Sequence, residues 1–329
     1  MTDVQTLRSG WRLGTPQQII DSLLELAVVP SFTKIGPALR RRLFDWEPLR
    51  QVPGRRIIIT GANSGIGFAA VKQLSALGAN VTIVARSKER GEKAVAEINS
   101  ASSSKASLLI GDLSSLESVR LLSAEILDIG EPIDALLHNA GALHNERQES
   151  VDGNELTLAT HVIGPFLMTH LLRPLIATGD DPRIVSMSSG GMYGQGISLS
   201  DIQTTRDYTG TLSYARAKRA QLLLNERWAE ELADDQVGVY TMHPGWVATP
   251  GVSEALPGFD RLMGPLLRSP SDGAETLSWL ATEPTAELGQ AGFWLDRATR
   301  PRHRIPATRS ADDKACELWT RISELAGVS

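Results

Sequence analysis

The sequence predicts an α/β fold of the doubly wound type, with a parallel sheet of about seven strands and helices on both of its faces. Short runs of β-branched and aliphatic residues alternate with longer segments of helical periodicity from residue 55 onward. Glycine, asparagine, serine and charged residues cluster directly after the expected strands. Because ligands bind at the carboxyl ends of the strands in such folds, this clustering supports the same fold class.

Seven strands are expected, and each of the first five is followed by an expected helix. The first strand begins at residue 55, and the others are expected at 80–85, 107–110, 133–137, 183–188, 237–242 and 292–295. The helices are expected at 68–77, 89–98, 113–127, 155–175 and 213–232. With 329 residues, of which 42% are hydrophobic, the chain can form one large domain with a packed core and an extension.

The extension lies before the first strand. Pro53 and Gly54 predict a turn, so we divide the chain into a helical N-terminal extension, 1–53, and a single α/β domain, 54–329. Apolar residues recur at roughly helical spacing in two segments of this extension, 19–27 and 32–46.

Arg40, Arg41 and Arg42 interrupt the second of these segments and allow two interpretations. One is a helical arm that packs on its own domain or on a second subunit and leaves the arginines solvated. The other is peripheral contact with a membrane through residues 15–46, because basic residues beside Phe, Leu and Trp are typical of helices at a membrane surface.

The composition excludes several classes of protein. A net charge of −5 gives no electrostatic reason to expect a nucleic-acid partner. The one cysteine, Cys316, cannot form an internal disulfide, so we expect a reducing compartment and a cytoplasmic location. The sequence has neither an apolar run of about 18 residues nor the form of a signal peptide at its start. The histidines lack metal-binding spacing, so we expect no metal site.

The first strand leads into a glycine-rich turn and then into a helical pattern. Gly61 lets the chain leave the strand sharply, Gly65 lets the backbone approach a phosphate, and Gly67 lets the helix pack closely on the strand. The N–H groups and the dipole at the start of the helix favour a pyrophosphate. We therefore predict a dinucleotide site, to which the intervening residues Asn63, Ser64 and Ile66 also contribute.

Arg86 and Ser87 follow the second strand, at the position that selects between the two nicotinamide dinucleotides. A site for NAD usually has an acid here, which accepts a hydrogen bond from the ribose 2′-hydroxyl. An acid would repel the 2′-phosphate of NADP, whereas an arginine pairs with it. The sequence therefore favours NADP(H) over NAD(H).

The turns after the third and fourth strands complete the expected cofactor site. Asp112 and Leu113 are placed to meet the edge and the face of the adenine. Asn139, Ala140 and Gly141 are small residues that allow the nicotinamide ribose to lie against the backbone.

Tyr214 and Lys218 are four residues apart in an expected helix and therefore lie on one face of it. A free phenol has a pKa near 10 and is a poor base at neutral pH, but a cation beside it favours the phenolate. Hydride transfer to a carbonyl needs a proton donor, and the reverse reaction needs a base. Tyr214 can fill either role, and Lys218 can also hold the ribose hydroxyls.

A serine hydroxyl at the end of the fifth strand can face Tyr214 across a substrate carbonyl. We choose Ser189 over Ser188 for this role, because a hydroxyl there would orient the carbonyl by hydrogen bonding. Tyr193 and Trp246 are candidate walls of the substrate site by their position in the chain.

The turn after the sixth strand is expected to lie beneath the nicotinamide. Pro244 and Gly245 make this turn rigid. The backbone of Val247 and the hydroxyl of Thr249 can then meet the carboxamide or the pyrophosphate.

These elements, in this order, resemble the short-chain dehydrogenase/reductase family. The matching residues are Thr60–Gly67 as T-G-x-x-x-G-x-G, Asp112, Asn139–Gly141, Ser189, Tyr214-x-x-x-Lys218 and Pro244–Gly245. Further sequence segments resemble those of the dehydrogenase/reductase family member 12 group, at 181–185, 188–192, 226–229, 242–246 and 249–252. Members of that group also carry an N-terminal extension. The resemblance implies a Rossmann-type sheet and an NAD(P)(H)-dependent oxidoreductase acting on CH–OH donors.

One position departs from the family pattern. His161 stands where the family usually has an asparagine, three residues before Gly164. The resemblance gives that asparagine two roles, which are to hold a helix kink and to pass a proton through water to the lysine. His161 either keeps a form of this relay, packs without a role in it, or weakens it and slows turnover.

Residues 250–270 are expected to form a substrate lid. Their apolar side chains, with glycine hinges at Gly258 and Gly264, favour a lipophilic or bulky small molecule, an apolar ketone, aldehyde or secondary alcohol, over a sugar or a charged acid. The other interpretation is that these residues pack against the body of the domain and carry no information on the substrate. The alternative function is a cofactor-binding protein with little turnover that acts as a sensor or scaffold. The resemblance implies a homodimer in which the long helices after the fourth and fifth strands pair with those of a second copy. If the N-terminal extension covers these helices instead, the chain is a monomer.

Overall fold

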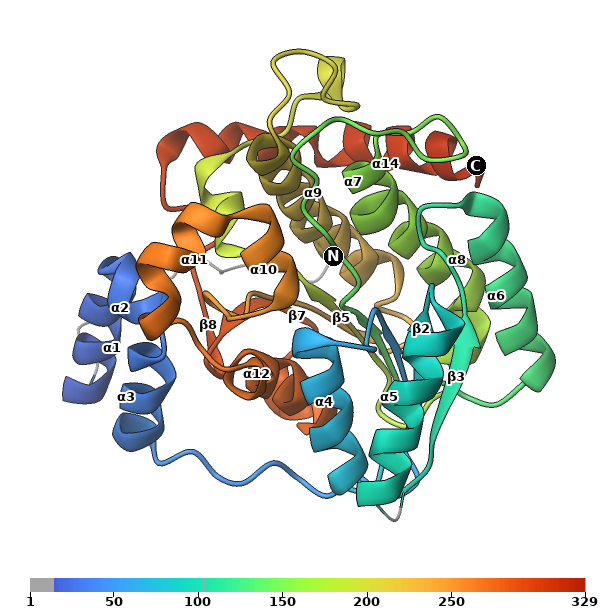
Figure 1. Cartoon of the computed structure of the whole chain (residues 1–329), viewed down its shortest axis with the longest axis horizontal. Helices are drawn as coiled ribbons and strands as arrows, with labels where there is room; N and C mark the ends of the chain where they lie inside the picture. The colour runs from blue at the N-terminus through green and yellow to red at the C-terminus, as the bar shows by residue number, and fades with distance from the viewer. Residues whose placement is uncertain (1–14, 103, 329) are drawn as a thin grey trace.

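A single eight-stranded sheet forms the centre of the protein (Figure 1), whose computed structural model describes residues 15–102 and 104–328. The strands lie in the order β3-β2-β1-β4-β5-β6-β7-β8, and only the β7–β8 pair is antiparallel. Their bounds are β1 (Arg56–Thr60), β2 (Asn80–Ala85), β3 (Ala106–Ile110), β4 (Ala135–His138), β5 (Arg183–Met187), β6 (Gly238–Met242), β7 (Ala291–Leu295) and β8 (Ala298–Thr299). The expected doubly wound fold is confirmed, with β8 as an additional edge strand.

Helices cover both faces of the sheet. Buried side chains of α4 (Gly65–Ala76), α5 (Lys88–Ala101) and α12 (Pro270–Thr282) form one core with one face. Those of α6 (Leu116–Ile129), α8 (Gly164–Ile176) and α9 (Gly210–Glu231) form a second core with the other face. The remaining short elements are α10 (Pro250–Ala255), α11 (Pro257–Met263), α13 (Thr285–Leu288) and the 3-10 turns η2 (Gly190–Gly194), η3 (Leu199–Asp201), η4 (Gly264–Leu266) and η5 (Pro306–Lys314).

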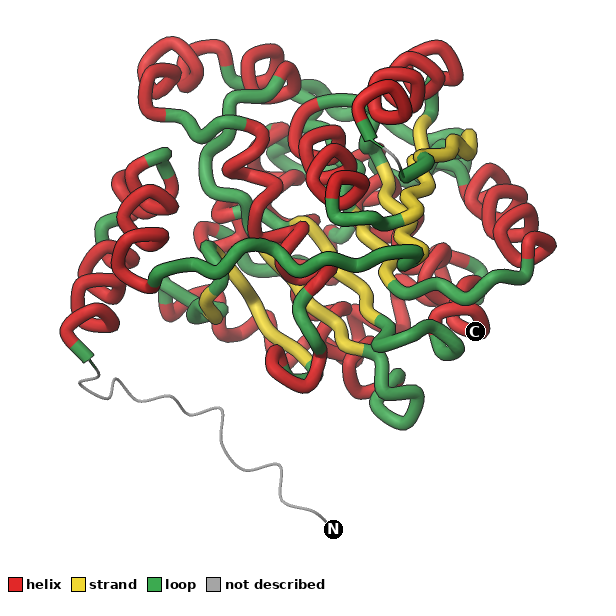
Figure 2. The backbone as a smooth tube through the Cα atoms, turned by 90° about the horizontal axis from the view of Figure 1, so that it is seen from below, coloured by secondary structure: helices red, strands yellow, loops and turns green. Residues whose placement is uncertain are grey.

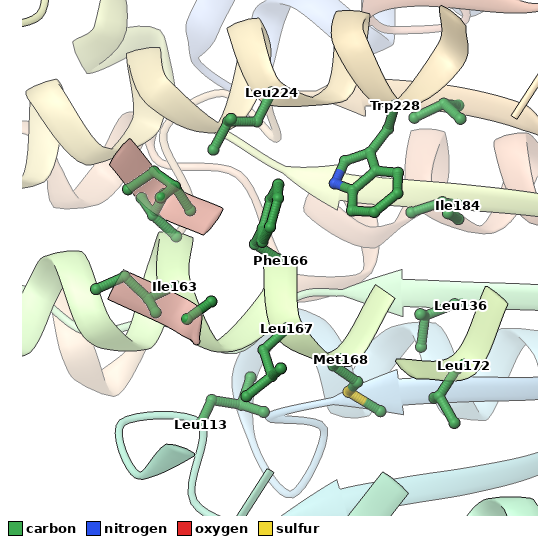
Figure 3. Packing of buried hydrophobic residues seen from close by; sticks show 14 of the residues in the cluster. Leu113, Leu136, Ile163, Phe166, Leu167, Met168, Leu172, Ile184, Leu224 and Trp228 are labelled. Atoms are coloured by element: carbon green, nitrogen blue, oxygen red, sulfur yellow. The ribbon is translucent and has the colours of Figure 1, made fainter. Parts of the chain in front are cut away.

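The C-terminal helix α14 (Ala315–Ala326) covers α8 and α9. The ring of Trp319 lies 4.8 Å from that of Phe166 and 4.7 Å from that of Trp228, measured between centroids. Figure 3 shows Phe166 pointing from α8 toward Leu224 and Trp228 of α9. The alternative that the N-terminal extension covers this surface is wrong, because α14 occupies it. A homodimer through α8 and α9 would require α14 to move, and dimerisation stays a prediction.

The helix expected at 155–175 is interrupted close to its start. It consists of α7 (Leu156–Leu158), a π-helical turn, η1 (Ala159–Ile163), and then α8. The Glu155 carboxylate begins it by accepting hydrogen bonds from the N–H groups of Thr157 (2.9 Å) and Leu158 (2.7 Å). A π-turn widens a helix locally and often occurs at functional sites. Here it carries His161.

The N-terminal extension forms three helices at one end of the molecule (Figures 1 and 2), as the sequence predicts. These are α1 (Pro16–Leu26), α2 (Val28–Phe32) and α3 (Ile35–Phe44). Figure 2 shows the following segment as a long loop that leads from α3 to the sheet. The extension packs on its own domain, and we call residues 15–46 the arm.

Buried ion pairs fix the arm to the domain. Arg40 of the arm is fully buried and donates to Asp21 (2.6 Å) and Glu25 (2.9 Å) of the arm and to Asp296 (2.5 Å) of the domain. On the domain side, Arg268 pairs with Asp296 (2.6 Å). Arg300 and Arg304 complete this arginine network by pairing with Asp21 and Glu25, respectively. Burial raises the pKa of Asp296, but the charges of Arg268 and Arg40 outweigh burial and hold it below its usual value.

This network corrects one expectation and explains an unusual orientation. We expected Arg40, Arg41 and Arg42 to be solvated, but only Arg41 and Arg42 are exposed. Both acidic residues of α1 point inward, where they pair with Arg40 and Arg300. The face of α1 that is exposed to solvent is therefore aliphatic. The exposed aliphatic residues of α1 and α2 are Ile19, Ile20, Leu23, Leu26, Val28 and Val29.

Candidate active site

The glycine turn after β1 has the backbone that a dinucleotide requires. Gly61 and Gly65 have φ angles of 65° and 57°, a left-handed conformation that favours glycine. A Cβ atom on Gly61 would lie 2.6 Å from the Cα of Ala140, and one on Gly67 would lie 2.4 Å from the Nδ2 of Asn139. Ser64 makes no side-chain cap, so it leaves the first N–H groups of α4 free to bind an anion. These residues fit a pyrophosphate.

Hydrogen bonds between the ends of β1 and β4 hold this turn in place. The side-chain amide of Asn139 donates to the carbonyl oxygens of Thr60 (2.9 Å) and Gly61 (3.0 Å). In return, the Thr60 hydroxyl accepts from the N–H groups of Asn139 and Ala140, both at 3.1 Å. Asn139 therefore acts mainly by fixing the glycine turn. The sequence gives Thr60 no separate role, although its place at the end of a strand beside a glycine is a usable signal.

Arg86 lies on the exposed surface after β2 and forms no ion pair with any described residue. Burial lowers the pKa of His144, Glu155 opposes this effect, and the charge of Arg86 adds to it. The charge of Arg86 thus acts on His144, which is in the loop that follows β4. Ser87 caps α5 by accepting from the N–H of Arg90 (3.4 Å), so its hydroxyl is already engaged.

The turn after β3 only partly fits the expected adenine site. The Asp112 carboxylate accepts hydrogen bonds from the N–H (2.9 Å) and the hydroxyl (2.7 Å) of Ser114. The Leu113 side chain is 5% exposed and belongs to the core, where Figure 3 shows it beside Leu167. We expected Leu113 to meet the adenine face, and its burial excludes its side chain from that role.

Lys218 is buried beneath Tyr214, as the four-residue spacing predicts. Its Nζ donates to the carbonyl oxygen of Met187 (2.7 Å) and lies 5.5 Å from the centroid of the Tyr214 ring. Burial lowers the pKa of Lys218 to about 7. Burial also raises the pKa of Tyr214, and the nearby Ser189 hydroxyl opposes this rise. We expected Lys218 to lower the pKa of Tyr214 below its ordinary value, but in this structure the effect of burial on the phenol is larger.

The two serines after β5 have separate positions. Ser188 is buried, and its hydroxyl donates to the carbonyl oxygen of Lys218 (2.9 Å). The Ser189 hydroxyl is at the surface and accepts from the N–H of Gly191 (3.2 Å). Ser189 is therefore the serine whose hydroxyl can reach a substrate.

His161 is buried next to Tyr214. The two rings meet edge to face, with centroids 5.4 Å apart. The Nε2 of His161 lies 3.0 Å from the N and 2.9 Å from the O of Ala142, so the ring holds the loop that follows Asn139. Its Nδ1 has no hydrogen-bond partner among the described residues. Burial and the charge of Lys218 lower the pKa of His161 well below its ordinary value, so the ring is neutral at physiological pH.

The turn after β6 is built around a close contact with Arg268 of the domain. Gly245 has a φ of 75°, and a Cβ there would lie 2.4 Å from the Nε of Arg268. Val247 is buried and forms an isolated parallel bridge with Arg268. The Thr249 hydroxyl caps α10 by accepting from the N–H of Val252 (3.3 Å). The Thr249 methyl group would lie 3.5 Å from a Cβ on Gly65, so the expected cofactor residues Gly65 and Thr249 are neighbours.

The two candidate wall residues are packed against Phe32, a residue of the arm. Tyr193 is 6% exposed, and its hydroxyl donates to the carbonyl oxygen of Pro301 (2.9 Å). Because it is buried in this way, Tyr193 is a supporting residue and not a wall of an open site. Trp246 is partly exposed and contacts Phe32 on one side (5.8 Å) and Phe259 of α11 on the other (5.2 Å).

No group of three or more metal-binding side chains comes together within 15–102 and 104–328. In the same part of the chain, no helix is long and apolar enough to span a membrane.

The sequence does not indicate the roles of Phe32 and Arg268. Neither residue lies in a recognisable motif, and only the fold brings them to the site.

A family model described as short chain dehydrogenase matches residues 55–258. The chain therefore belongs to the short-chain dehydrogenase/reductase family, and with it to the NAD(P)-dependent oxidoreductases. It is close to the member 12 group, since it is 40% identical to "Dehydrogenase/reductase SDR family member 12" of Bos taurus over 84% of this chain and 87% of that protein.

The chain is also similar to a retinol dehydrogenase and to a solved structure. "Retinol dehydrogenase 14" of Mus musculus is 32% identical over 89% of this chain and 92% of its own. A crystal structure of an uncharacterized protein from Mycobacterium paratuberculosis matches with a TM-score of 0.69 and 26% identity, covering 85% of this chain and 96% of that one.

The buried Lys218 predicts an unusual dependence of stability on pH. Its pKa is about 7 in the folded protein and 10.5 for a lysine exposed to water, so between these values the unfolded state binds more protons. The free energy of unfolding should therefore rise with pH, by about 2 kcal/mol between pH 7 and 9. Urea unfolding without added nucleotide measures this rise, which Lys218→Met should remove and the exposed Lys93→Met should retain. If the free energy of unfolding rises with pH equally in the wild type and in Lys218→Met, the buried Lys218 is not the cause of the rise.

Proposed function

We propose that the protein is an NADP(H)-dependent oxidoreductase acting on an apolar ketone, aldehyde or secondary alcohol. The observation that carries the proposal is that α9 brings Tyr214 and Lys218 to the carboxyl end of β5, where Lys218 donates to Met187 and the Tyr214 phenol lies beside the Ser189 hydroxyl. A bound nicotinamide would supply or accept the hydride. The glycine turn, the loop after β4 and Thr249 are the parts of the chain that would hold the dinucleotide.

Tyr214 is the residue that we assign to proton transfer. In reduction its phenol donates a proton to the carbonyl oxygen, and in oxidation the phenolate accepts a proton from the alcohol. The Ser189 hydroxyl donates a hydrogen bond to the same oxygen and orients it. The Lys218 ammonium, whose Nζ lies 5.5 Å from the centroid of the Tyr214 ring, stabilises the phenolate by its positive charge. His161 keeps Tyr214 and the Ala142 loop in position.

Tyr214→Phe tests the assignment of the proton donor. Removing a general acid usually lowers the rate about 10²- to 10⁴-fold, so kcat should fall by that amount while NADPH affinity is retained. Turnover is measured as NADPH consumption with a panel of apolar carbonyls. Tyr208→Phe is the matched control, because the Tyr208 hydroxyl donates to the carbonyl oxygen of His144 and has no part in the proposed proton transfer. This variant should keep near-normal turnover.

Two outcomes of this experiment count against the enzyme. If Tyr214→Phe turns over as fast as the wild type, Tyr214 is not the proton donor. If the wild type binds NADPH but consumes none with any carbonyl, the alternative function as a cofactor-binding sensor or scaffold gains support. The replacement of the family asparagine by His161 is the feature that favours this alternative.

The preference for NADP(H) is supported by Arg86. Its guanidinium is exposed and forms no ion pair with the described residues, so it is available to a 2′-phosphate. Hydrogen bonds to charged groups contribute about 1.5–3 kcal/mol, which corresponds to about 10- to 100-fold in affinity.

Arg86→Asp should therefore weaken NADPH binding by roughly 10- to 100-fold and leave NADH binding equal or stronger. Fluorescence titration of the purified protein with each nucleotide measures both affinities. Lys93→Asp makes the same charge change on the outer face of α5 and should leave the order of affinities unchanged. NADPH affinity that is insensitive to Arg86→Asp would falsify the role of this arginine.

The segment 250–270 supports an apolar substrate. It forms α10, α11 and η4, which bury no residue of their own. Phe259 contacts Trp246, whereas Leu262 on the same helix is 78% exposed. We infer that this lid presents apolar side chains to a carbonyl or alcohol that enters beside Trp246.

We also propose that the arm makes peripheral contact with a membrane. Between Thr15 and Ile35 the only exposed charged side chain is that of Lys34, because Asp21 and Glu25 are buried in the arginine network. The outward aliphatic face of α1 and α2 is therefore uncharged, and the exposed Lys34 and Arg42 follow it. This arrangement suits the surface of an anionic membrane and agrees with a cytoplasmic location.

Flotation with vesicles of phosphatidylcholine and phosphatidylserine tests the membrane contact. The wild type should float, and the double variant Leu23→Asn, Leu26→Asn should bind at least about tenfold more weakly, since it loses two exposed leucines of the face. Leu121→Asn, a change at a 66% exposed leucine of α6, should float as the wild type does. Self-association without vesicles, abolished by the same double variant, would show instead that the face binds a second copy of the chain.

A further inference from the structure

Phe32, the last residue of α2, is packed against the two turns of the proposed active site that carry Ser189 and Trp246. It is 3% exposed and belongs to a small cluster of buried side chains that also includes Met192 and Tyr193. Phe32 comes from the arm, whereas the rest of the cluster comes from the domain. The arm therefore inserts a ring into the part of the domain that carries Ser189 and Trp246.

On one side, Phe32 supports the turn that follows Ser189. A Cβ placed on Gly190 would lie 2.4 Å from the Cε2 of Phe32, so the ring is in direct contact with the backbone of this turn. Tyr193, at the other end of the same turn, stacks on Phe32 with centroids 6.5 Å apart. The guanidinium of Arg304 lies 5.1 Å from the Phe32 ring and 4.6 Å from the Tyr193 ring.

On the other side, Phe32 supports the turn that carries Trp246. The carbonyl oxygen of Phe32 accepts hydrogen bonds from the N–H of Trp246 (2.7 Å) and from the Nε of Arg268 (3.0 Å). The Phe32 ring packs edge to face against the rings of His243 (4.6 Å) and Trp246 (5.8 Å). Trp246 then contacts Phe259 of the lid. One residue of the arm thus links the Ser189 turn, the Trp246 turn and, through Trp246, the lid.

We propose that Phe32 is a positioning residue of the active site, which sets the distance between the Ser189 hydroxyl and the Trp246 side of the substrate site. Trp246, held between Phe32 and Phe259, is then the surface that selects the apolar part of the substrate. Phe32 does not touch the substrate and acts only through the two turns. This inference rests on the proposed oxidoreductase function, but the packing of the turns can be tested without turnover.

The first experiment measures the backbone around Ser189 and Trp246 directly. Hydrogen–deuterium exchange of the full chain is compared for wild type, Phe32→Ala and Leu24→Ala. Leu24→Ala is the matched control, because it shortens a buried side chain of the same arm that belongs to none of the contacts described above. Phe32→Ala should speed exchange in 189–194 and 244–249, and Leu24→Ala should not. Unchanged exchange in both segments overturns the inference, whether or not a substrate is known.

The second experiment uses turnover and the conservative variant. Phe32→Ala should lower kcat/KM by about tenfold or more, with a larger loss for a bulky apolar carbonyl than for a small one, and NADPH affinity should be unchanged. Phe32→Leu should restore most of this loss, and it replaces Phe32→Ala if the alanine variant does not fold. An equal loss for bulky and small carbonyls, or equal losses in Phe32→Ala and Leu24→Ala, would show a purely structural role. Absence of turnover in the wild type contradicts the proposed function, whereas the exchange result stands independently.

Discussion

The close approach of β1 and β4 at their carboxyl ends is the constraint on which the site depends. Here the strand order reverses, and the chains leave the sheet in opposite directions and open a crevice between them. Four hydrogen bonds among Thr60, Gly61, Asn139 and Ala140 keep this crevice at a fixed width. The glycines at 61 and 67 are required because the facing loop leaves no room for a Cβ.

A second constraint comes from the buried ammonium of Lys218. Desolvation destabilises its charged form, and one hydrogen bond to a carbonyl oxygen replaces the water that it loses. The folded protein tolerates this cost because β5 and α9 are held together by a large apolar core on which α14 also packs. In the proposed mechanism, a phenolate at Tyr214 would offset this cost by pairing with the lysine. The stability lost by burying Lys218 would then serve proton transfer.

The fold and the centre of the site could be predicted from the sequence because both depend on local patterns. Strand periodicity, the glycine spacing and the four-residue interval between Tyr214 and Lys218 are properties of short segments. Expectations failed where a distant segment decides the environment. The local sequence predicts that Arg40 is a solvated helix residue. In the structure it is buried because it pairs with Asp296, which is 256 residues away in the sequence. Leu113 and Tyr193 likewise follow strands, as binding residues do, but packing from α8 and from the arm buries them.

The arginine network has a consequence for how this chain can be divided and how it can change. The family match begins at residue 55, yet a chain cut there would keep Arg268, Arg300 and Arg304 with Asp296 as their one acidic partner in the network. The missing carboxylates are Asp21 and Glu25, so the cut would leave three arginines with one carboxylate, whereas the complete network, with Arg40, has four arginines and three carboxylates. The unit that family comparison recognises is therefore smaller than the unit that holds the ion-pair partners of these arginines. Loss of Asp21 or Glu25 would leave the arginines beside β8 with fewer carboxylate partners, so the arm and this edge of the sheet depend on each other.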